Sequence, residues 1–180
     1  KKIGLTAWLY DEDRWPSGTA GGEVTKILEF QMKFISMYDE ASVPEPGVYI
    51  ACQLGRFAIK IASDGSMLDY YKIGEGEALK DGYVIKKFLV EHMKENQFYN
   101  GYTYLDTMNI NATNAFLQST HEKYKAKCGE LFGKTLMGVF TDEPYRGSVL
   151  NGFGMDNKNR LNMIPYSYQL YSKYKAITGE

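Results

Sequence analysis

The sequence predicts an α/β fold in which a parallel β-α-β-α pattern is interrupted by an antiparallel β insert. Two short apolar runs, residues 3–10 and 135–141, have the composition of strands that are buried on both faces. Residues 26–94 alternate between apolar and polar side chains, as half-buried antiparallel strands do. Apolar residues at helical spacing then follow in residues 109–129 and 166–177.

Composition narrows the class of protein. The chain has 180 residues with a net charge of −1, whereas a broad nucleic-acid surface requires an excess of Lys and Arg. Nucleic acid is therefore not an expected partner. No apolar run is long enough for a transmembrane helix, so a membrane is not an expected partner either. Two cysteines form no disulfide framework and leave the cellular compartment open. Aromatic residues make up 14%, and such residues often line ligand grooves.

The insert is expected to contain four strands. Leu28, Phe30, Met32 and Phe34 alternate with polar residues and predict a strand over 28–34. Residues 57–61 repeat the pattern, and the Asp64-Gly65 pair predicts a hairpin that returns over 67–73. A further strand is expected over 83–90. The chain is accordingly divided into residues 1–25, an inserted antiparallel β subdomain over 26–98, and residues 99–180.

The last part of the chain is expected to be helix, strand, loop and helix. Asn109 is a suitable N-cap for one continuous helix that ends at Gly129. On that helix, His121 is expected to be partly buried and hydrogen-bonded rather than a metal ligand or a base. The strand over 135–141 ends at Asp142-Glu143-Pro144, and a Gly- and Asn-rich loop runs to about Met163. Pro165 then suits the start of the final helix.

The candidate site lies beyond the carboxyl ends of the two apolar strands, which parallel pairing brings to one face. The first end is followed by Asp11, Asp13, Arg14 and Trp15, and the second by Asp142 and Glu143. Carboxylates accept hydrogen bonds from hydroxyls and transfer protons, and aromatic rings pack on the C–H face of a sugar. This combination favours carbohydrate chemistry.

Each of these residues also has a plainer interpretation. Pro144 is expected to hold Glu143 in extended geometry at the strand end, yet Asp142-Glu143-Pro144 also fits an ordinary strand-to-loop transition. The segment Asp11–Asp13 also fits a solvated acidic turn, or a loop that binds Ca²⁺, although the ligand spacing of an EF-hand is absent. The Trp15 ring either faces a ligand or packs on its own loop.

Three segments resemble bacterial TIM-barrel glycoside hydrolases of the clan-A type, the β-galactosidase-like and α-L-rhamnosidase-like proteins. They are Trp8–Gly18 followed by Gly21-Gly22, then Tyr104–Asn109 together with Thr120–Tyr124, and finally Gly138–Pro144, which is similar to the fourth barrel strand. The resemblance implies a partial TIM-barrel (parallel βαβα) segment around barrel strands three and four, with an inserted antiparallel β subdomain. It also implies that Glu143 is the general acid/base and that Asp142, Asp11, Asp13, Trp15 and Arg14 bind substrate.

The expected function is therefore part of a glycoside hydrolase that acts on plant or host glycans without a cofactor. The resemblance places the second catalytic carboxylate on a later strand, so the isolated chain is expected to be an inactive fragment. The fragment is also expected to expose apolar surface and to self-associate through it. The alternative is a non-catalytic carbohydrate-binding module or a structural β module. A bacterial cytoplasmic, periplasmic or secreted location is equally compatible with the sequence.

Overall fold

A computed structural model describes residues 3–144 and 163–179. Its residues cluster into two compact units. One unit contains residues 3–32, 93–144 and 167–179, and the other contains residues 33–92 with 163–166. The first carries the candidate site, and the second is a β-sheet.

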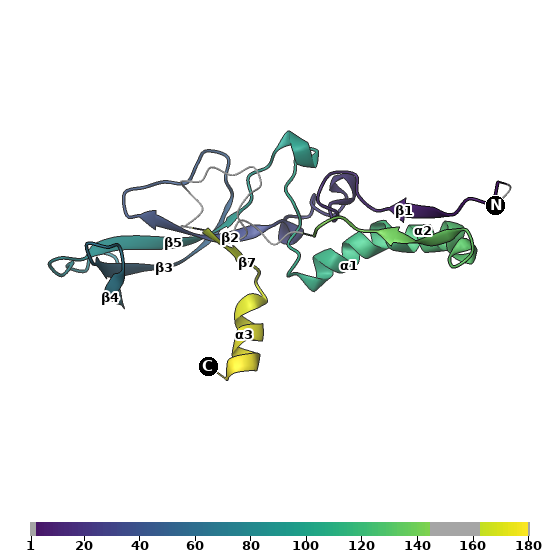
Figure 1. The fold of residues 1–180 in the computed structure, drawn as a ribbon. Helices are drawn as coiled ribbons and strands as arrows, with labels where there is room; N and C mark the ends of the chain where they lie inside the picture. The colour runs from purple at the N-terminus through teal and green to yellow at the C-terminus, as the bar shows by residue number, and fades with distance from the viewer. Residues whose placement is uncertain (1–2, 145–162, 180) are drawn as a thin grey trace. The chain divides into compact units, whose positions relative to one another are not determined.

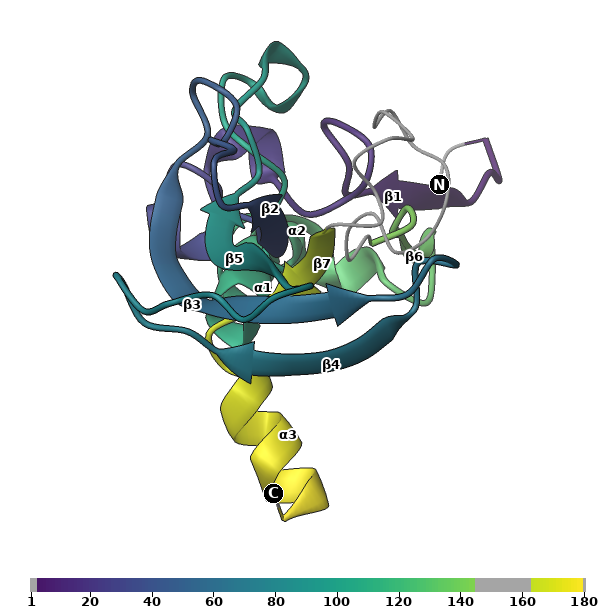
Figure 2. The same cartoon turned by 90° about the vertical axis from the view of Figure 1, so that its left-hand side faces the viewer.

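The second unit is a five-stranded antiparallel sheet with the strand order β4-β3-β5-β2-β7. The strands are β2 (Lys33–Asp39), β3 (Ile50–Ile61), β4 (Met67–Lys72), β5 (Val84–His92) and β7 (Met163–Tyr166). Figure 2 shows β3 and β4 curving side by side. The last strand in the sequence pairs with the first of the sheet, so the sheet combines local hairpins with one distant segment.

Local turn chemistry forms the β3–β4 hairpin. The Asp64 carboxylate accepts hydrogen bonds from the backbone N–H of Ser66 at 2.9 Å and from its hydroxyl at 2.6 Å. Gly65 has a φ of +84°, which glycine adopts at little cost. The hairpin predicted at Asp64-Gly65 is therefore confirmed, and so is the strand predicted over 83–90.

A buried histidine at the end of β5 makes the stability of this unit depend on pH. His92 is only 4% exposed, and burial, with a smaller contribution from the nearby Lys33 ammonium, lowers its pKa to about 4. The pKa of an unfolded histidine is about 6.5, so below that pH the unfolded chain binds a proton that the folded chain does not. This contribution to stability is complete above about pH 6.5 and is lost as the pH falls toward 4.

We therefore expect acidification to cost less stability in a His92→Gln variant than in the parent chain. The difference between the parent and the variant should be roughly 2 kcal/mol when urea unfolding at pH 4.5 is compared with pH 7. Comparing the same two pH values within each protein cancels any constant cost of the substitution. An equal loss in both proteins would show that His92 does not cause this pH dependence.

The first unit contains a two-stranded parallel sheet, β1 (Ala7–Tyr10) with β6 (Leu136–Phe140). Its α-helices are α1 (Ile110–Ser119), α2 (His121–Cys128) and α3 (Leu170–Thr178). Figure 1 shows α1 and α2 following one another, and β6 comes next among the strands along the chain. Short 3₁₀ turns lie at η1 (Ala20–Gly22), η2 (Leu28–Phe30), η3 (Gln97–Tyr99) and η4 (Gly129–Leu131).

The helix expected over 109–129 is divided into two. Asn109 is the N-cap as predicted, because its side-chain oxygen accepts a hydrogen bond from Asn111 N at 3.0 Å. Thr120 leaves helical geometry with φ −122° and ψ −68°, which ends α1 and allows α2 to begin at His121.

The predicted fold class is wrong: the chain is not a parallel βαβα segment of a TIM barrel. Within residues 3–144 and 163–179, parallel pairing between strands is confined to β1 and β6, and the larger sheet is antiparallel throughout. The segment after β6 also departs from the pattern. Pro165 and Tyr166 belong to β7, which pairs antiparallel with β2, and α3 begins only at Leu170.

The strand expected over 28–34 is also wrong in its first half. Leu28–Phe30 form a 3₁₀ turn, and β2 begins at Lys33. Leu28 is 44% exposed, so the alternating residues there do not share one buried face. Most of the Gly- and Asn-rich loop expected before Met163 lies outside the described residues. None of the described helices has the length and apolarity required to cross a lipid bilayer.

Candidate functional site

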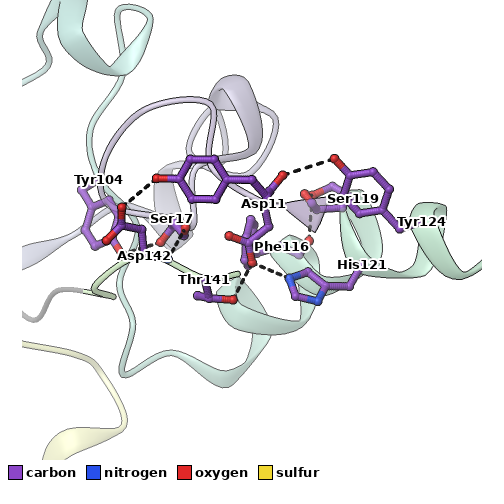
Figure 3. Close-up of polar contacts among 11 residues, drawn as sticks. Asp11, Ser17, Tyr104, Phe116, Ser119, His121, Tyr124, Thr141 and Asp142 are labelled. Atoms are coloured by element: carbon purple, nitrogen blue, oxygen red, sulfur yellow. Dashed lines mark hydrogen bonds and ion pairs between the residues drawn. The ribbon is translucent and has the colours of Figure 1, made fainter. Parts of the chain in front are cut away.

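The carboxyl ends of β1 and β6 lie together, and Asp11 connects them. Its Oδ2 atom lies 2.7 Å from His121 Nε2 and accepts a hydrogen bond from the Thr141 hydroxyl at 2.7 Å (Figure 3). The Asp11 side chain is 0% exposed. Because the carboxylate can only accept, His121 donates to it through Nε2. Asp11 therefore ties β1 to α2 and to the end of β6.

The histidine is held on a second side by an aromatic ring. Phe116 of α1 packs edge-on against the His121 ring with centroids 5.5 Å apart. The expectation that His121 is partly buried and hydrogen-bonded is confirmed. The other Asp11 oxygen, Oδ1, is buried and has no hydrogen-bond partner within the described part of the chain. Within that part of the chain, the Asp11 carboxylate therefore makes both of its hydrogen bonds through Oδ2.

Tyr10 connects two further acids. Its hydroxyl lies 2.5 Å from Glu12 Oε2 and 2.7 Å from Asp142 Oδ2. Hydrogen bonding to Glu12, and then to Asp142, holds the pKa of Tyr10 well above its usual range, so the phenol keeps its proton throughout the physiological range. A phenol has one proton and can donate it to only one of these oxygens at a time. The two carboxylates therefore retain capacity to accept hydrogen bonds from a ligand.

The backbone before Glu143 is fixed by Ser17. Ser17 N donates to the Asp142 carbonyl oxygen at 2.9 Å, and Asp142 N donates to Ser17 Oγ at 2.9 Å. The buried Tyr104 hydroxyl donates to the Ser17 carbonyl oxygen at 2.8 Å. Figure 3 shows Ser17, Tyr104 and Asp142 close together. The loop after β1 and the segment after β6 therefore hold each other in place.

Glycine is required beside this contact. Gly18 has a φ of +146°, and a Cβ atom at this position would lie 2.3 Å from Leu105 Cδ2. A side chain would force Leu105 or the loop to move. The close approach explains why a glycine follows Ser17.

Glu143 is exposed, and its side chain makes no hydrogen bond within residues 3–144 and 163–179. The expectation that Pro144 holds it in extended geometry is wrong, because the φ of Glu143 is +40°. An L-residue in this left-handed region is strained, and such residues cluster at functional sites. The reciprocal Ser17–Asp142 bonds provide local contacts that hold the backbone at this point.

The remaining candidates form a separate cluster in the loop after β1. Asp13 accepts hydrogen bonds from Thr19 Oγ1 at 3.0 Å and from Asn100 Nδ2 at 3.4 Å. Arg14 Nη1 donates to the Asp13 carbonyl oxygen at 3.0 Å, and Trp15 is half-buried. Asp11 and Asp13 thus have different partners. The described residues contain no group of three or more His, Cys, Asp or Glu side chains placed to hold a metal ion, including Ca²⁺.

Sequence reasoning identified Asp142 and Glu143 but missed the residues that hold Asp142. Tyr10 and Glu12 are two residues apart, a spacing that places both side chains on one side of an extended segment. That spacing could have identified the pair. The contacts of Ser17, Tyr104 and Thr141 join segments distant in sequence, and their local sequence contains no comparable signal.

Comparison with protein-family models, with curated proteins and with solved structures finds no match to this chain.

Proposed function

We propose that the chain forms part of a glycoside hydrolase active site in which Glu143 is the general acid/base. The observation that carries the proposal is the Tyr10 hydroxyl, which joins Glu12 and Asp142 beside Glu143 at the ends of two parallel strands. Acids gathered there suit a substrate rich in hydroxyl groups, because carboxylates accept hydrogen bonds from them.

The proposed chemistry assigns different roles to the neighbouring acids. Glu143 protonates the glycosidic oxygen as the bond to the leaving group breaks, and a second carboxyl group attacks the sugar or activates water. Asp142 is held by Tyr10 and Ser17 and accepts a hydrogen bond from a substrate hydroxyl. The exposure of Glu143 supports its role, since an acid that protonates substrate must be reachable.

Asp11 has a positioning role in this proposal rather than a substrate contact. It holds Thr141, the residue immediately before Asp142, and is not exposed. Asp13, Arg14 and Trp15 stay proposed substrate contacts at the edge of the site, since Asp13 and Arg14 are exposed and Trp15 is half-buried.

The proposal is tested by assaying a panel of aryl glycosides with the purified chain and with the longer enzyme that the proposal implies. We expect the longer enzyme to release the aryl group from at least one glycoside and the chain alone to release none, because the proposal places the second carboxyl group outside this chain. Failure of the longer enzyme on every glycoside would contradict the proposal. Turnover by the chain alone would show that both carboxyl groups lie within it.

A non-catalytic sugar-binding role for the five-stranded sheet has less support. Tyr70, Phe57 and Phe88 form a row across β4, β3 and β5, with centroid separations of 6.4 and 5.6 Å. Tyr70 is exposed, but Phe57 and Phe88 are half-buried and pack edge-on at 85°. Rings in this arrangement pack against each other instead of offering one flat surface to a sugar.

A further inference from the structure

One face of the β1–β6 sheet carries three large aromatic side chains that are open to solvent. Trp8 is 64% exposed, Tyr10 is 46% exposed and Phe140 is 54% exposed. Tyr10 pairs in register with Phe140, and their ring centroids lie 5.4 Å apart. Trp8 lies two residues before Tyr10 on β1, so its side chain projects from the same face. Proteins rarely expose such a surface without a use for it.

Gly138 gives Trp8 its place on this face. A Cβ atom at Gly138 would lie 2.6 Å from Trp8 Cζ3 and 3.0 Å from Trp8 Cε3. The benzo ring of Trp8 therefore lies directly on the backbone of β6, where any side chain would push it away. Most of the indole stays exposed, which leaves a flat apolar platform beside the Tyr10 and Phe140 rings.

The platform ends at the two carboxylates that share the Tyr10 hydroxyl. Glu12 and Asp142 together offer several acceptor lone pairs, and Tyr10 supplies one proton to them. A ligand that covers the platform must therefore donate hydrogen bonds at this end. The two negative charges favour a neutral hydroxyl-rich ligand over an anionic one.

A protein surface is a less suitable occupant. Covering the platform with another chain would remove Glu12 and Asp142 from water beside the apolar contact, and an incompletely paired buried carboxylate costs several kcal/mol. A pyranose ring has an apolar C–H face for the Trp8 indole and hydroxyls at its edge for the carboxylates. It meets both requirements at once.

We propose that Trp8, Tyr10, Gly138 and Phe140, with Glu12 and Asp142 at one end, form a subsite that binds one pyranose ring of a neutral glycan. The inference rests on the proposed function for its substrate class and adds the surface that holds the sugar. Trp8 and Phe140 supply the apolar contact, and Gly138 is a positioning residue for Trp8.

The test is equilibrium binding of cellotetraose, xylotetraose and β-1,4-galactotetraose to the chain, measured by titration calorimetry. We expect Trp8→Ala and Gly138→Ala each to weaken binding about tenfold, the loss expected for an aromatic contact of roughly 1.4 kcal/mol. Tyr70→Ala is the matched control, because Tyr70 is similarly exposed at 59% but lies on the other sheet, and it should bind like the parent. Circular dichroism checks that each variant is folded.

Three outcomes would overturn the inference: no binding of any of the three probes, parent-like binding by folded Trp8→Ala, or a concentration-dependent dimer that Trp8→Ala abolishes. The last would assign the platform to a second copy of the chain. A different experiment would contradict the proposed function. A Glu143→Gln variant of the longer enzyme that keeps full turnover removes the acid/base assignment but leaves sugar binding at Trp8 untouched.

Discussion

Replacing Glu143 with glutamine is expected to lower turnover of an unactivated glycoside by about two to four powers of ten. Glutamine keeps the size and exposure of the side chain but cannot donate the proton that the leaving oxygen needs. The loss should appear in kcat, because a proton transferred in the transition state contributes little to binding of the ground state. The measurement is the steady-state rate of the longer enzyme that the proposal implies, with and without the substitution.

The matched control for this experiment is Glu130→Gln. Glu130 is an exposed glutamate in η4 of the same unit and has no place in the proposed site. Its turnover should equal that of the parent enzyme. Near-normal turnover of Glu143→Gln would remove Glu143 from the mechanism, and an equal loss in Glu130→Gln would indicate a general effect of removing negative charge.

Replacing Asp11 with alanine is expected to destabilise the chain by roughly 3 kcal/mol. The substitution leaves the His121 N–H and the Thr141 hydroxyl without their shared acceptor and opens a space at a side chain that is 0% exposed. Asp11→Asn keeps one oxygen that can accept and should lose less. Urea unfolding at pH 7 gives the free energy of unfolding for each variant.

Asp13→Ala is the control for Asp11, because both carboxylates accept hydrogen bonds in the same loop but Asp13 is exposed. Exposed polar contacts of this kind contribute about 1 kcal/mol or less. If Asp11→Ala were no more destabilising than Asp13→Ala, the Asp11–His121–Thr141 contacts would not hold the two strand ends together.

Two local signals in the sequence predicted local structure correctly. Asp64-Gly65 determines a turn through its own backbone and side-chain bonds, and Asn109 caps α1 in the same way. Alternation at Leu28–Phe34 was misleading because a 3₁₀ turn also carries side chains to different sides within a few residues. In a segment this short, the spacing of apolar residues does not distinguish a strand from a 3₁₀ turn.

The fold class depends on pairing between distant segments, and this is where sequence reasoning failed. β7 joins β2 across about 130 residues, a contact that neither strand signals in its own composition. In the candidate site, too, the contacts between distant segments could not be predicted. Asp142 and Glu143 were identifiable from the end of an apolar run, whereas the bond between Asp11 and His121 spans 110 positions. Burial of Asp11 could not be inferred from an acidic segment that also fits a solvated turn.

The most direct test of the account is the dependence of kcat/KM on the pKa of the leaving group, measured for the parent enzyme and for Glu143→Gln with a series of aryl glycosides. Substrates with good leaving groups need little protonation, so the variant should approach the parent for acidic phenols and fall progressively behind for weakly acidic ones. The plot for Glu143→Gln is therefore predicted to be steeper. Two parallel lines would contradict the assignment of Glu143 as the general acid.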